Sequence, residues 1–488
     1  MRRNILLACC AVFAALLLLE GGWRAYYFLK NRNTEPEGAF ALYAVGESSV
    51  AGFSDLSFVS ALGKMYEGGF AGRKLYVNNL ARSGFVAYAH RTALRQHISF
   101  RKHVNPAALI IYTGHNEPAS QPVCGLGQKL WLSFGEALAS KSYFLSDMLY
   151  LMWERGIFQA LVPQSHEWYE LQLRRMVENA RANGVQPFIA TVASNMSGAD
   201  PSLNLDDEEK FMAVAGPGME LERAAAWPKA LVYYKSMLEA QPAYVAHCYF
   251  RLGKCAERLR DYDAARKYYW LSADTEPRLC LGKVDSRQTQ IIKNLAAEYK
   301  IPLVDTVAAF EKNSPHGIMG SNLLGDGQHP NTAGVALLAD LFSQALASYY
   351  RTPQAPVLRS AQALRKLMHT GPDYDMKVHR GYLSSLLRYS YLHKPWTEAA
   401  REHAAEHAGV LRKLAPGDNL LDYYFFLLEQ APHMNGLLGC KSGFPSGVLE
   451  DLTPEGEYAE LSRLYGKIAA GGTACSWPVR VCPACIVI

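Results

Sequence analysis

Residues 40–52 read FALYAVGESSVAG, an apolar run that passes directly into a small polar turn. The apolar half, Phe40 to Val45, predicts a buried strand, and the polar half predicts a tight turn into a helix. Residues 107–113, AALIIYT, form a second run that is apolar almost throughout. Such continuous runs are typical of strands in parallel sheets, because helices cover both faces of these sheets.

Outward from these two runs, strand-like segments alternate with helix-like segments. Further strands are predicted at Leu75 to Asn79, Pro187 to Val192 and Pro302 to Asp305. Helices are predicted at Leu56 to Tyr66, Glu167 to Asn183, Ile291 to Tyr299 and Thr332 to Tyr349. This alternation predicts an α/β domain with a parallel sheet and helices on both faces.

The size and charge of the chain exclude some classes of protein. A length of 488 residues predicts about two to four domains, and 11% aromatic residues are too many for a mostly disordered chain. Fifty Lys and Arg residues against 45 Asp and Glu residues leave a net charge of only +5. A dedicated nucleic-acid-binding protein concentrates more positive charge, so we expect no nucleic-acid partner.

The N-terminal segment, residues 1–30, contains the unbroken apolar run Ile5 to Leu19 behind Arg2 and Arg3. At 1.5 Å per residue this run reaches roughly 22 Å, and extension to Trp23 brings it near the ~30 Å of a bilayer core. We expect a membrane anchor. The alternatives are a cleaved secretory signal, although no small-residue cleavage site comes after the run, and a buried helix. Signal anchors usually export the chain on their C-terminal side, so the rest of the protein is expected to be extracytoplasmic, in the periplasm.

After a polar linker, residues 31–38, the α/β pattern is interrupted by residues 205–280. Here a self-similarity at a 35-residue interval repeats Ala230, Tyr234 and Pro242 as Ala265, Tyr269 and Pro277. The pattern resembles a tetratricopeptide repeat, with one clear copy over 246–277 and a partial copy before it. The resemblance implies a surface for a protein partner, and the alternative is an ordinary helical hairpin.

Four short motifs lie directly after predicted strands or before the last long helix. They are Gly46-Glu47-Ser48-Ser49-Val50-Ala51-Gly52, Asn79-Leu80-Ala81-Arg82-Ser83-Gly84, Gly114-His115-Asn116-Glu117 and Asp326-Gly327-Gln328-His329-Pro330. Open parallel sheets bind ligands at the carboxyl ends of their strands, so we expect the motifs to converge there. A serine needs a neighbouring base to act as a nucleophile, and Asp326 and His329 have a spacing that lets a carboxylate orient an imidazole.

Together the four motifs resemble the blocks of the SGNH (GDSL-type) hydrolase family. The resemblance implies a flavodoxin-like three-layer α/β/α domain with a parallel sheet. The resemblance covers residues 40–195 and 285–348, and the domain that it implies spans residues 39–204 and 281–350, on either side of the all-α insertion. An α-helical region is expected at 351–488. No metal and no cofactor are expected.

The resemblance also assigns roles by motif. Ser48 resembles the nucleophile and His329 the general base, oriented by Asp326. The backbone N–H groups of Ser48 and Gly84, with the Asn116 side chain, correspond to the oxyanion hole.

Two positions depart from the family pattern, because Glu47 and Glu117 stand where aspartate is usual. Both keep the charge, which indicates a subfamily. Ser49 beside Ser48 makes the nucleophile slightly ambiguous, although the motif register favours Ser48. His115 is expected to be structural or part of a pocket wall.

The function implied is a membrane-anchored esterase that acts on O-acyl groups, with O-acetyl groups as one class, in a glycan, lipid or small ester. The alternative is an envelope-assembly protein, non-catalytic or an acyltransferase, that binds a protein partner through the helical repeats. All catalytic positions are filled, which favours the enzyme. Hydrolases and transferases of this family share the same motifs, so the sequence leaves open whether water or another hydroxyl group accepts the acyl group.

Several other features have a structural interpretation. Residues 403–407, HAAEH, match a zinc pattern but lie in a charged helix-like segment, which favours a solvated face. Cys482 and Cys485 favour a loose pair in an irregular tail. An aromatic stretch is interpreted as core or lid packing, with an acyl- or glycan-binding wall as the alternative; it comprises Trp131, Phe134, Tyr143, Phe144, Leu149, Tyr150 and Trp153.

Overall fold

The structure is a computed structural model of the chain. It describes residues 2–31, 35–52, 56–100, 106–117, 136–154, 165–201, 208–276, 283–355, 357–358, 360–371, 376, 378–379 and 407–414.

Within these residues, parallel strands form one five-stranded sheet in the order β2-β1-β3-β4-β5. The strands are β1 (Phe40–Gly46), β2 (Leu75–Asn79), β3 (Ala107–Tyr112), β4 (Val185–Ala190) and β5 (Leu303–Val304). This is the flavodoxin-like order, in which the chain reverses direction across the sheet between β1 and β3. Every residue of β1 and β3 is buried, as their continuous apolar sequences predict. The predicted α/β class is confirmed.

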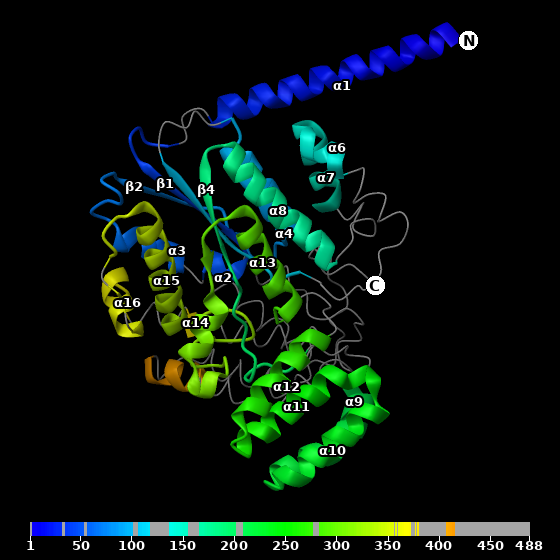
Figure 1. Cartoon of the computed structure of the whole chain (residues 1–488), viewed down its shortest axis with the longest axis vertical. Helices are drawn as coiled ribbons and strands as arrows, with labels where there is room; N and C mark the ends of the chain where they lie inside the picture. Colours follow the sequence, from blue (N-terminus) through cyan, green and yellow to red (C-terminus); the bar gives the residue numbers. More distant parts are fainter. Residues whose placement is uncertain are drawn as a thin grey trace, which may run out of the picture.

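Helices cover both faces of the sheet (Figure 1). On one face, α3 (Phe58–Met65) packs against α15 (Thr332–Tyr350). The rings of Phe58 and Phe342 stack between these helices with centroids 4.9 Å apart. The other face carries α4 (Ala87–Ile98), α8 (His166–Ala182) and α13 (Ser286–Tyr299), and α8 contacts both of the other two helices. The three layers place all four motifs at one edge of the sheet.

Strand β4 lies slightly earlier in the sequence than the predicted strand at 187–192. It starts at Val185, directly after Gly184, whose φ of +71° ends α8. The register with β3 begins there, because Val185 pairs with Ala107. Pairing with the neighbouring strand therefore set a boundary that the hydrophobic pattern alone placed two residues too late.

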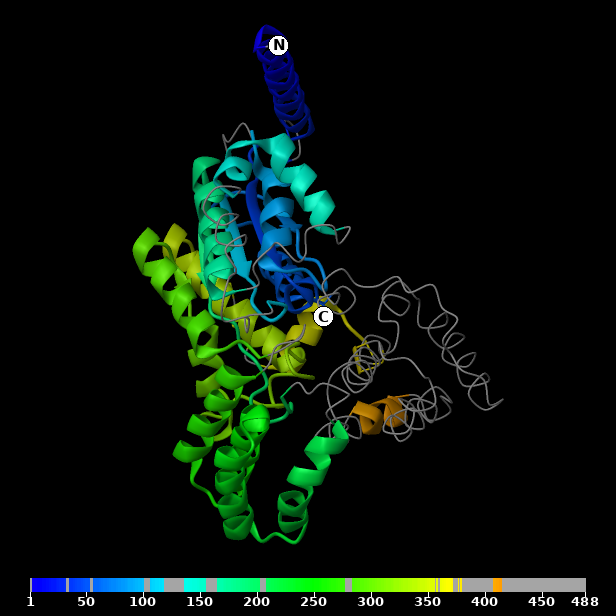
Figure 2. The ribbon, with the colours of Figure 1, turned by 90° about the vertical axis from the view of Figure 1, so that its right-hand side faces the viewer.

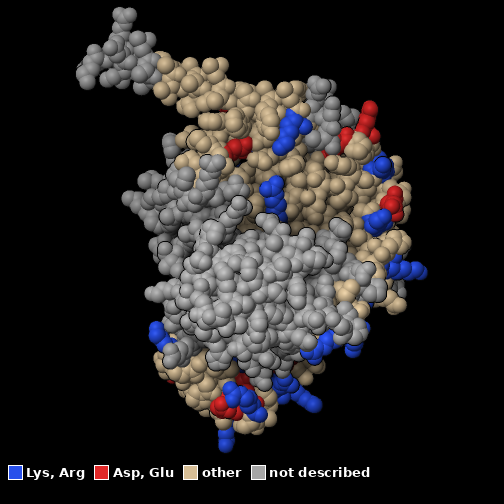
Figure 3. Space-filling model, turned by 180° about the vertical axis from the view of Figure 1, so that it is seen from behind, with Lys and Arg blue, Asp and Glu red and all other residues tan. Residues whose placement is uncertain are grey.

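The first helix, α1 (Arg2–Asn31), has two different halves. The side chains of residues 10–19 are exposed, and Figure 3 shows this protruding part without charged side chains. The second half lies against the domain, where Tyr27 is 2% and Asn31 3% exposed. By length and composition, Cys10–Asn31 is apolar enough to cross a membrane.

The inserted residues form two helical hairpins at the end of the molecule opposite α1 (Figure 2). Their helices are α9 (Glu208–Arg223), α10 (Trp227–Ala240), α11 (Val245–Arg258) and α12 (Tyr262–Thr275). A Cβ on Gly218 would lie 2.7 Å from the Tyr234 ring, and a Cβ on Gly253 would lie 2.8 Å from the Tyr269 ring. Both pairs are related by the 35-residue interval, so the self-similarity has a packing basis. The tetratricopeptide assignment itself stays a prediction.

Further helices lie in the described part of the chain, including residues 407–414. The others are α6 (Glu136–Lys141), α7 (Tyr143–Glu154), α14 (Thr306–Lys312) and α16 (Ala361–Met368), which packs against α3 and α15. The predicted domain boundaries stay predictions. Some residues singled out from the sequence lie outside the described residues, namely Trp131, Phe134, His403, Glu406, Cys482 and Cys485.

Candidate active site

Ser48, His329 and Asp326 form a hydrogen-bonded series at the carboxyl edge of the sheet. The Ser48 hydroxyl and His329 Nε2 are 2.6 Å apart, and His329 Nδ1 lies 2.6 Å from Asp326 Oδ2. Ser48 opens α2 (Ser48–Ala51) directly after β1, whereas the other two side chains lie on the loop before α15. The fold therefore brings together side chains from motifs that are far apart in the sequence.

The buried Asp326 carboxylate controls the tautomer of His329. Its Oδ1 accepts hydrogen bonds from the backbone N–H groups of Gln328 at 2.9 Å and His329 at 2.8 Å. Burial alone would raise the pKa of Asp326. Attraction to the His329 ring and the hydrogen bonds to both oxygens outweigh burial and hold this pKa well below its ordinary value. The ionised carboxylate keeps a proton on Nδ1, so Nε2 presents its lone pair to Ser48.

The loop that carries the base is hydrogen-bonded to the segment after β4. Asn195 Nδ2 donates to the Asp326 carbonyl at 2.9 Å, and the Asn195 N–H donates to the Gly327 carbonyl at 3.0 Å. Asn195 is fully buried. It was not singled out from the sequence, because its only signal is a polar residue shortly after a predicted strand.

Close packing at the end of β1 explains why the first motif begins with a glycine. A Cβ at Gly46 would lie 2.1 Å from the Tyr112 carbonyl oxygen, so a larger residue would push β1 away from β3. Ser49 is 2% exposed, and its hydroxyl has no hydrogen-bond partner in the described part of the chain. Of the two adjacent serines, Ser48 is the one that faces His329.

Gly84 and Asn116, the two further residues expected in an oxyanion hole, come after the strands on either side of β1. The Arg82 N–H donates to the Gly46 carbonyl at 3.0 Å, so the second motif runs beside the serine turn. Gly84 has a φ of +75°, in the left-handed region that favours glycine. Asn116 donates one side-chain N–H to the Phe85 carbonyl at 3.0 Å, and an amide has a second N–H. Ser48 and Asn116 flank the β1–β3 switch point, where this topology forms its ligand crevice.

Glu47 joins the first motif to the third. Its buried Oε1 accepts from the backbone N–H groups of Gly114 at 2.9 Å and His115 at 2.6 Å. The His115 and His90 rings lie against the same carboxylate, 3.4 Å and 3.7 Å away. Burial alone would raise the pKa of Glu47, but its interactions with His115 and His90 hold that pKa well below its ordinary value. His115 also lies 3.0 Å from the Ala193 carbonyl through Nε2, which gives it a structural role.

Glu117, the second departure from the family pattern, also has a structural partner. Its Oε1 accepts a hydrogen bond from the Ala87 N–H in the first turn of α4. A carboxylate at a helix N-terminus is stabilising, because the first N–H groups have no partner within the helix. The longer side chains of Glu47 and Glu117 thus hold the Asn116 turn from two sides. No sequence pattern pointed to the buried His90 in this network.

We expect Glu47→Ala to lower the free energy of unfolding by about 3–5 kcal/mol, because the two backbone N–H groups it serves would be buried without partners. Glu47→Gln keeps an acceptor oxygen and should cost less. The low pKa of folded Glu47 stabilises the protein fully above its ordinary value of 4.5. This contribution is lost as the pH falls below that value. Denaturant titrations at neutral and acidic pH measure both effects.

A matched control for this prediction is Glu67→Ala, whose side chain is 74% exposed in a surface pair. It should change stability by no more than about 0.5 kcal/mol. An equal loss in the two alanine variants would contradict the structural role of Glu47.

The interpretation of residues 403–407 as a solvated face is wrong for His407. This residue is 6% exposed, and its Nε2 lies 2.8 Å from the Gly325 carbonyl on the loop before α15. His407 Nδ1 lies 2.9 Å from His379 Nδ1. The described residues contain no cluster of three or more side chains suited to a metal ion.

Two side chains of the aromatic stretch pack against α1. The Phe144 ring lies edge-on to Trp23 with centroids 5.4 Å apart, and the Tyr143 ring lies 5.5 Å from Tyr27. These two side chains therefore serve packing, which agrees with the structural interpretation of this stretch.

Comparison with known proteins yields no matching family model and no match among curated proteins. Among solved structures, a Bacillus subtilis protein is similar at 16% identity and a TM-score of 0.31, over 64% of this chain and 58% of the other. The match thus spans less than two thirds of that protein. A GDSL-like lipase from Bacteroides thetaiotaomicron is similar at 12% identity and a TM-score of 0.31, over 67% of this chain and 96% of the other.

The chain's own sheet topology defines its fold. The sheet has the flavodoxin-like order that the four motifs implied, and Ser48 and His329 meet at its carboxyl edge. The chain therefore has an α/β/α fold with a parallel sheet in the flavodoxin-like order.

Proposed function

We propose that this chain is an SGNH-type serine hydrolase that cleaves ester bonds through Ser48, His329 and Asp326. The observation that carries the proposal is the pair of 2.6 Å contacts that link the hydroxyl to the imidazole and the imidazole to the carboxylate. A serine hydroxyl is a weak nucleophile unless a base takes its proton, and this arrangement provides that base.

The proposed reaction proceeds through an acyl-enzyme. The Ser48 oxygen attacks the ester carbonyl while its proton moves to His329 Nε2. The resulting tetrahedral oxyanion accepts hydrogen bonds from the N–H groups of Ser48 and Gly84 and from the Asn116 amide. His329 then gives its proton to the departing alcohol, and water attacks the acyl-enzyme with the same imidazole as base. Each oxyanion donor typically contributes ~2.7–4 kcal/mol of transition-state stabilisation.

The proposed substrate class is an O-acyl ester of a glycan, a lipid or a small molecule, with O-acetyl groups as the first class to test. We also propose that α1 anchors the chain in a membrane and that the catalytic domain lies on the extracytoplasmic side. The repeat hairpins α9–α12 would then be available to a protein partner in the same compartment.

A fluorophosphonate probe tests the proposed nucleophile directly. The oxygen of an activated serine displaces fluoride from phosphorus, and the phosphonyl group stays on the enzyme. We expect the folded full-length chain to be labelled at Ser48, as mapped by peptide mass spectrometry. The heat-denatured chain should not be labelled, since the reaction needs His329 in place.

Absence of label on the folded chain, or label on Ser49 in place of Ser48, would refute the assignment. Competition by p-nitrophenyl acetate during labelling links the labelled serine to ester hydrolysis.

A further inference from the structure

The second half of α1 is built into the domain by polar contacts. Asp147 of α7 accepts hydrogen bonds on Oδ2 from Trp23 Nε1 at 3.0 Å and from the Tyr27 hydroxyl. Glu20 accepts from the backbone N–H groups of Tyr143 and Phe144, both at 3.1 Å, at the start of α7. These contacts hold α1 in one position relative to α7.

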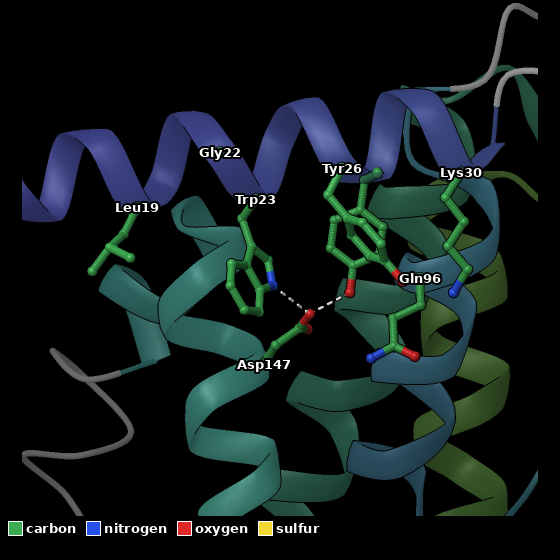
Figure 4. A pocket seen from close by; sticks show the side chains of 8 residues that line it. Leu19, Gly22, Trp23, Tyr26, Lys30, Gln96 and Asp147 are labelled. Atoms are coloured by element: carbon green, nitrogen blue, oxygen red, sulfur yellow. Dashed lines mark hydrogen bonds between the residues drawn. The ribbon is translucent and has the colours of Figure 1, made fainter.

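A cavity of about 630 Å³ remains between α1 and the helices α4 and α7 (Figure 4). It is lined by Leu19, Gly22, Trp23, Tyr26, Tyr27, Lys30, Gln96 and Asp147. Leu19 belongs to the exposed apolar half of α1, whereas Lys30 lies near its polar end. The lining therefore changes from apolar to cationic along α1, over roughly 16 Å at 1.5 Å per residue.

One polar atom at this cavity lacks a partner. Asp147 Oδ2 serves Trp23 and Tyr27, but Asp147 Oδ1 is buried and has no hydrogen-bond partner among the described residues. A buried carboxylate oxygen without a donor is costly. The rings of Trp23 and Tyr26 beside it offer π faces that attract a cation.

We propose that this cavity binds the headgroup of a membrane phospholipid that carries a primary amine. The ammonium donates to Asp147 Oδ1, the phosphate lies at Lys30, and the acyl chains run along Leu19 into the bilayer that α1 enters. Tryptophan and tyrosine are enriched at the level of phospholipid headgroups, which agrees with their place in this lining. The inference rests on the proposed membrane anchoring of α1.

The cavity is separate from the catalytic site. Figure 1 shows α1 across the edge of the sheet where β1 begins, whereas α2, which starts with Ser48, lies at the opposite edge. The bound lipid is therefore a structural ligand at the membrane surface, and changes in the cavity should leave ester hydrolysis at Ser48 unchanged.

The test uses the full chain in bilayers that contain phosphatidylethanolamine and phosphatidylcholine in equal amounts. Phosphatidylcholine carries a trimethylated nitrogen and has no N–H to donate. Native mass spectrometry of the detergent-extracted chain is expected to show retained phosphatidylethanolamine in excess. Asp147→Asn should lower this preference about tenfold, the value of one charge-assisted hydrogen bond, whereas Lys30→Gln should lower the retention of both lipids about equally, because both carry the phosphate.

Asp147→Asn changes only the proposed contact with the ammonium. Its amide oxygen still accepts from Trp23 and Tyr27, while NH₂ replaces Oδ1. Its thermal stability in phosphatidylcholine alone should match that of the unchanged chain. Lys141→Gln is the matched control for Lys30→Gln, since both lysines are exposed and Lys141 does not line the cavity. It should retain both lipids as the unchanged chain does.

Equal retention of the two lipids by the unchanged chain, or an undiminished preference in Asp147→Asn, would overturn the proposal. If the full chain fractionates with membranes yet shows no preference, the lipid site fails and the anchor stands. If the chain does not fractionate with membranes, both fail. Esterase activity reports separately on the catalytic proposal.

Discussion

Replacement of Ser48 by alanine is expected to lower kcat for p-nitrophenyl acetate by about 10⁴-fold or more. The variant loses the oxygen that forms the acyl-enzyme, and His329 keeps no nucleophile within 2.6 Å. Residual hydrolysis would come from water, helped only by substrate binding and the oxyanion donors. Steady-state kinetics of the purified full-length chain measure the change.

Ser49→Ala is the natural control, because Ser49 has the same side chain one position later but is buried away from His329. This variant should retain activity within a few-fold of the unchanged chain. Full activity of Ser48→Ala, or loss of activity in Ser49→Ala alone, would show that the nucleophile has been misassigned.

The second large effect is expected for Asp326→Asn, with a loss of about 10⁴-fold in kcat. Oδ1 must remain an oxygen, because the backbone N–H groups of Gln328 and His329 both donate to it. The amide NH₂ then takes the place of Oδ2 and donates to His329 Nδ1. The imidazole proton is forced onto Nε2, which can no longer accept the proton of Ser48.

This tautomer argument separates the variant from a simple loss of folding. Asp326→Asn should keep its hydrogen bonds to the loop, so its circular dichroism and unfolding midpoint at neutral pH should stay close to those of the unchanged chain. Asp263→Asn, at a side chain that is 91% exposed, serves as the control and should keep its activity. Unimpaired hydrolysis by Asp326→Asn would remove Asp326 from the mechanism.

The four motifs were accessible from the sequence because each lies at a predictable place. Ser48 comes after an apolar run long enough to identify β1, and Asn116 comes after the similar run of β3. Chain order and the rule that parallel sheets bind ligands at their carboxyl edge were sufficient to expect Ser48 near His329. No pattern predicted that Asn195 would hold the backbone of Asp326, because that contact depends on where β4 ends in three dimensions.

The choice between Ser48 and Ser49 shows the same limit. Both are small and polar and come after the same strand, so hydrophobic pattern treats them alike. The short helix after Gly46 turns one hydroxyl toward the histidine and the other into the protein. A rotation of about 100° per residue along a helix decided which serine is exposed to the base.

The sequence by itself determined the order of the strands along the chain, the carboxyl-edge motifs and the apolar length of α1, because these depend on neighbouring residues. Tertiary structure alone decided which groups Glu47 and Glu117 contact. Glu47 meets His90 and the Gly114 turn only after α4 packs against β1 and β3 pairs with β1. Tertiary structure alone also holds the second half of α1 against the domain. Trp23 donates a hydrogen bond there to Asp147, which lies more than a hundred residues away in the sequence. Such contacts arise from burial and geometry between distant segments, which no local pattern encodes.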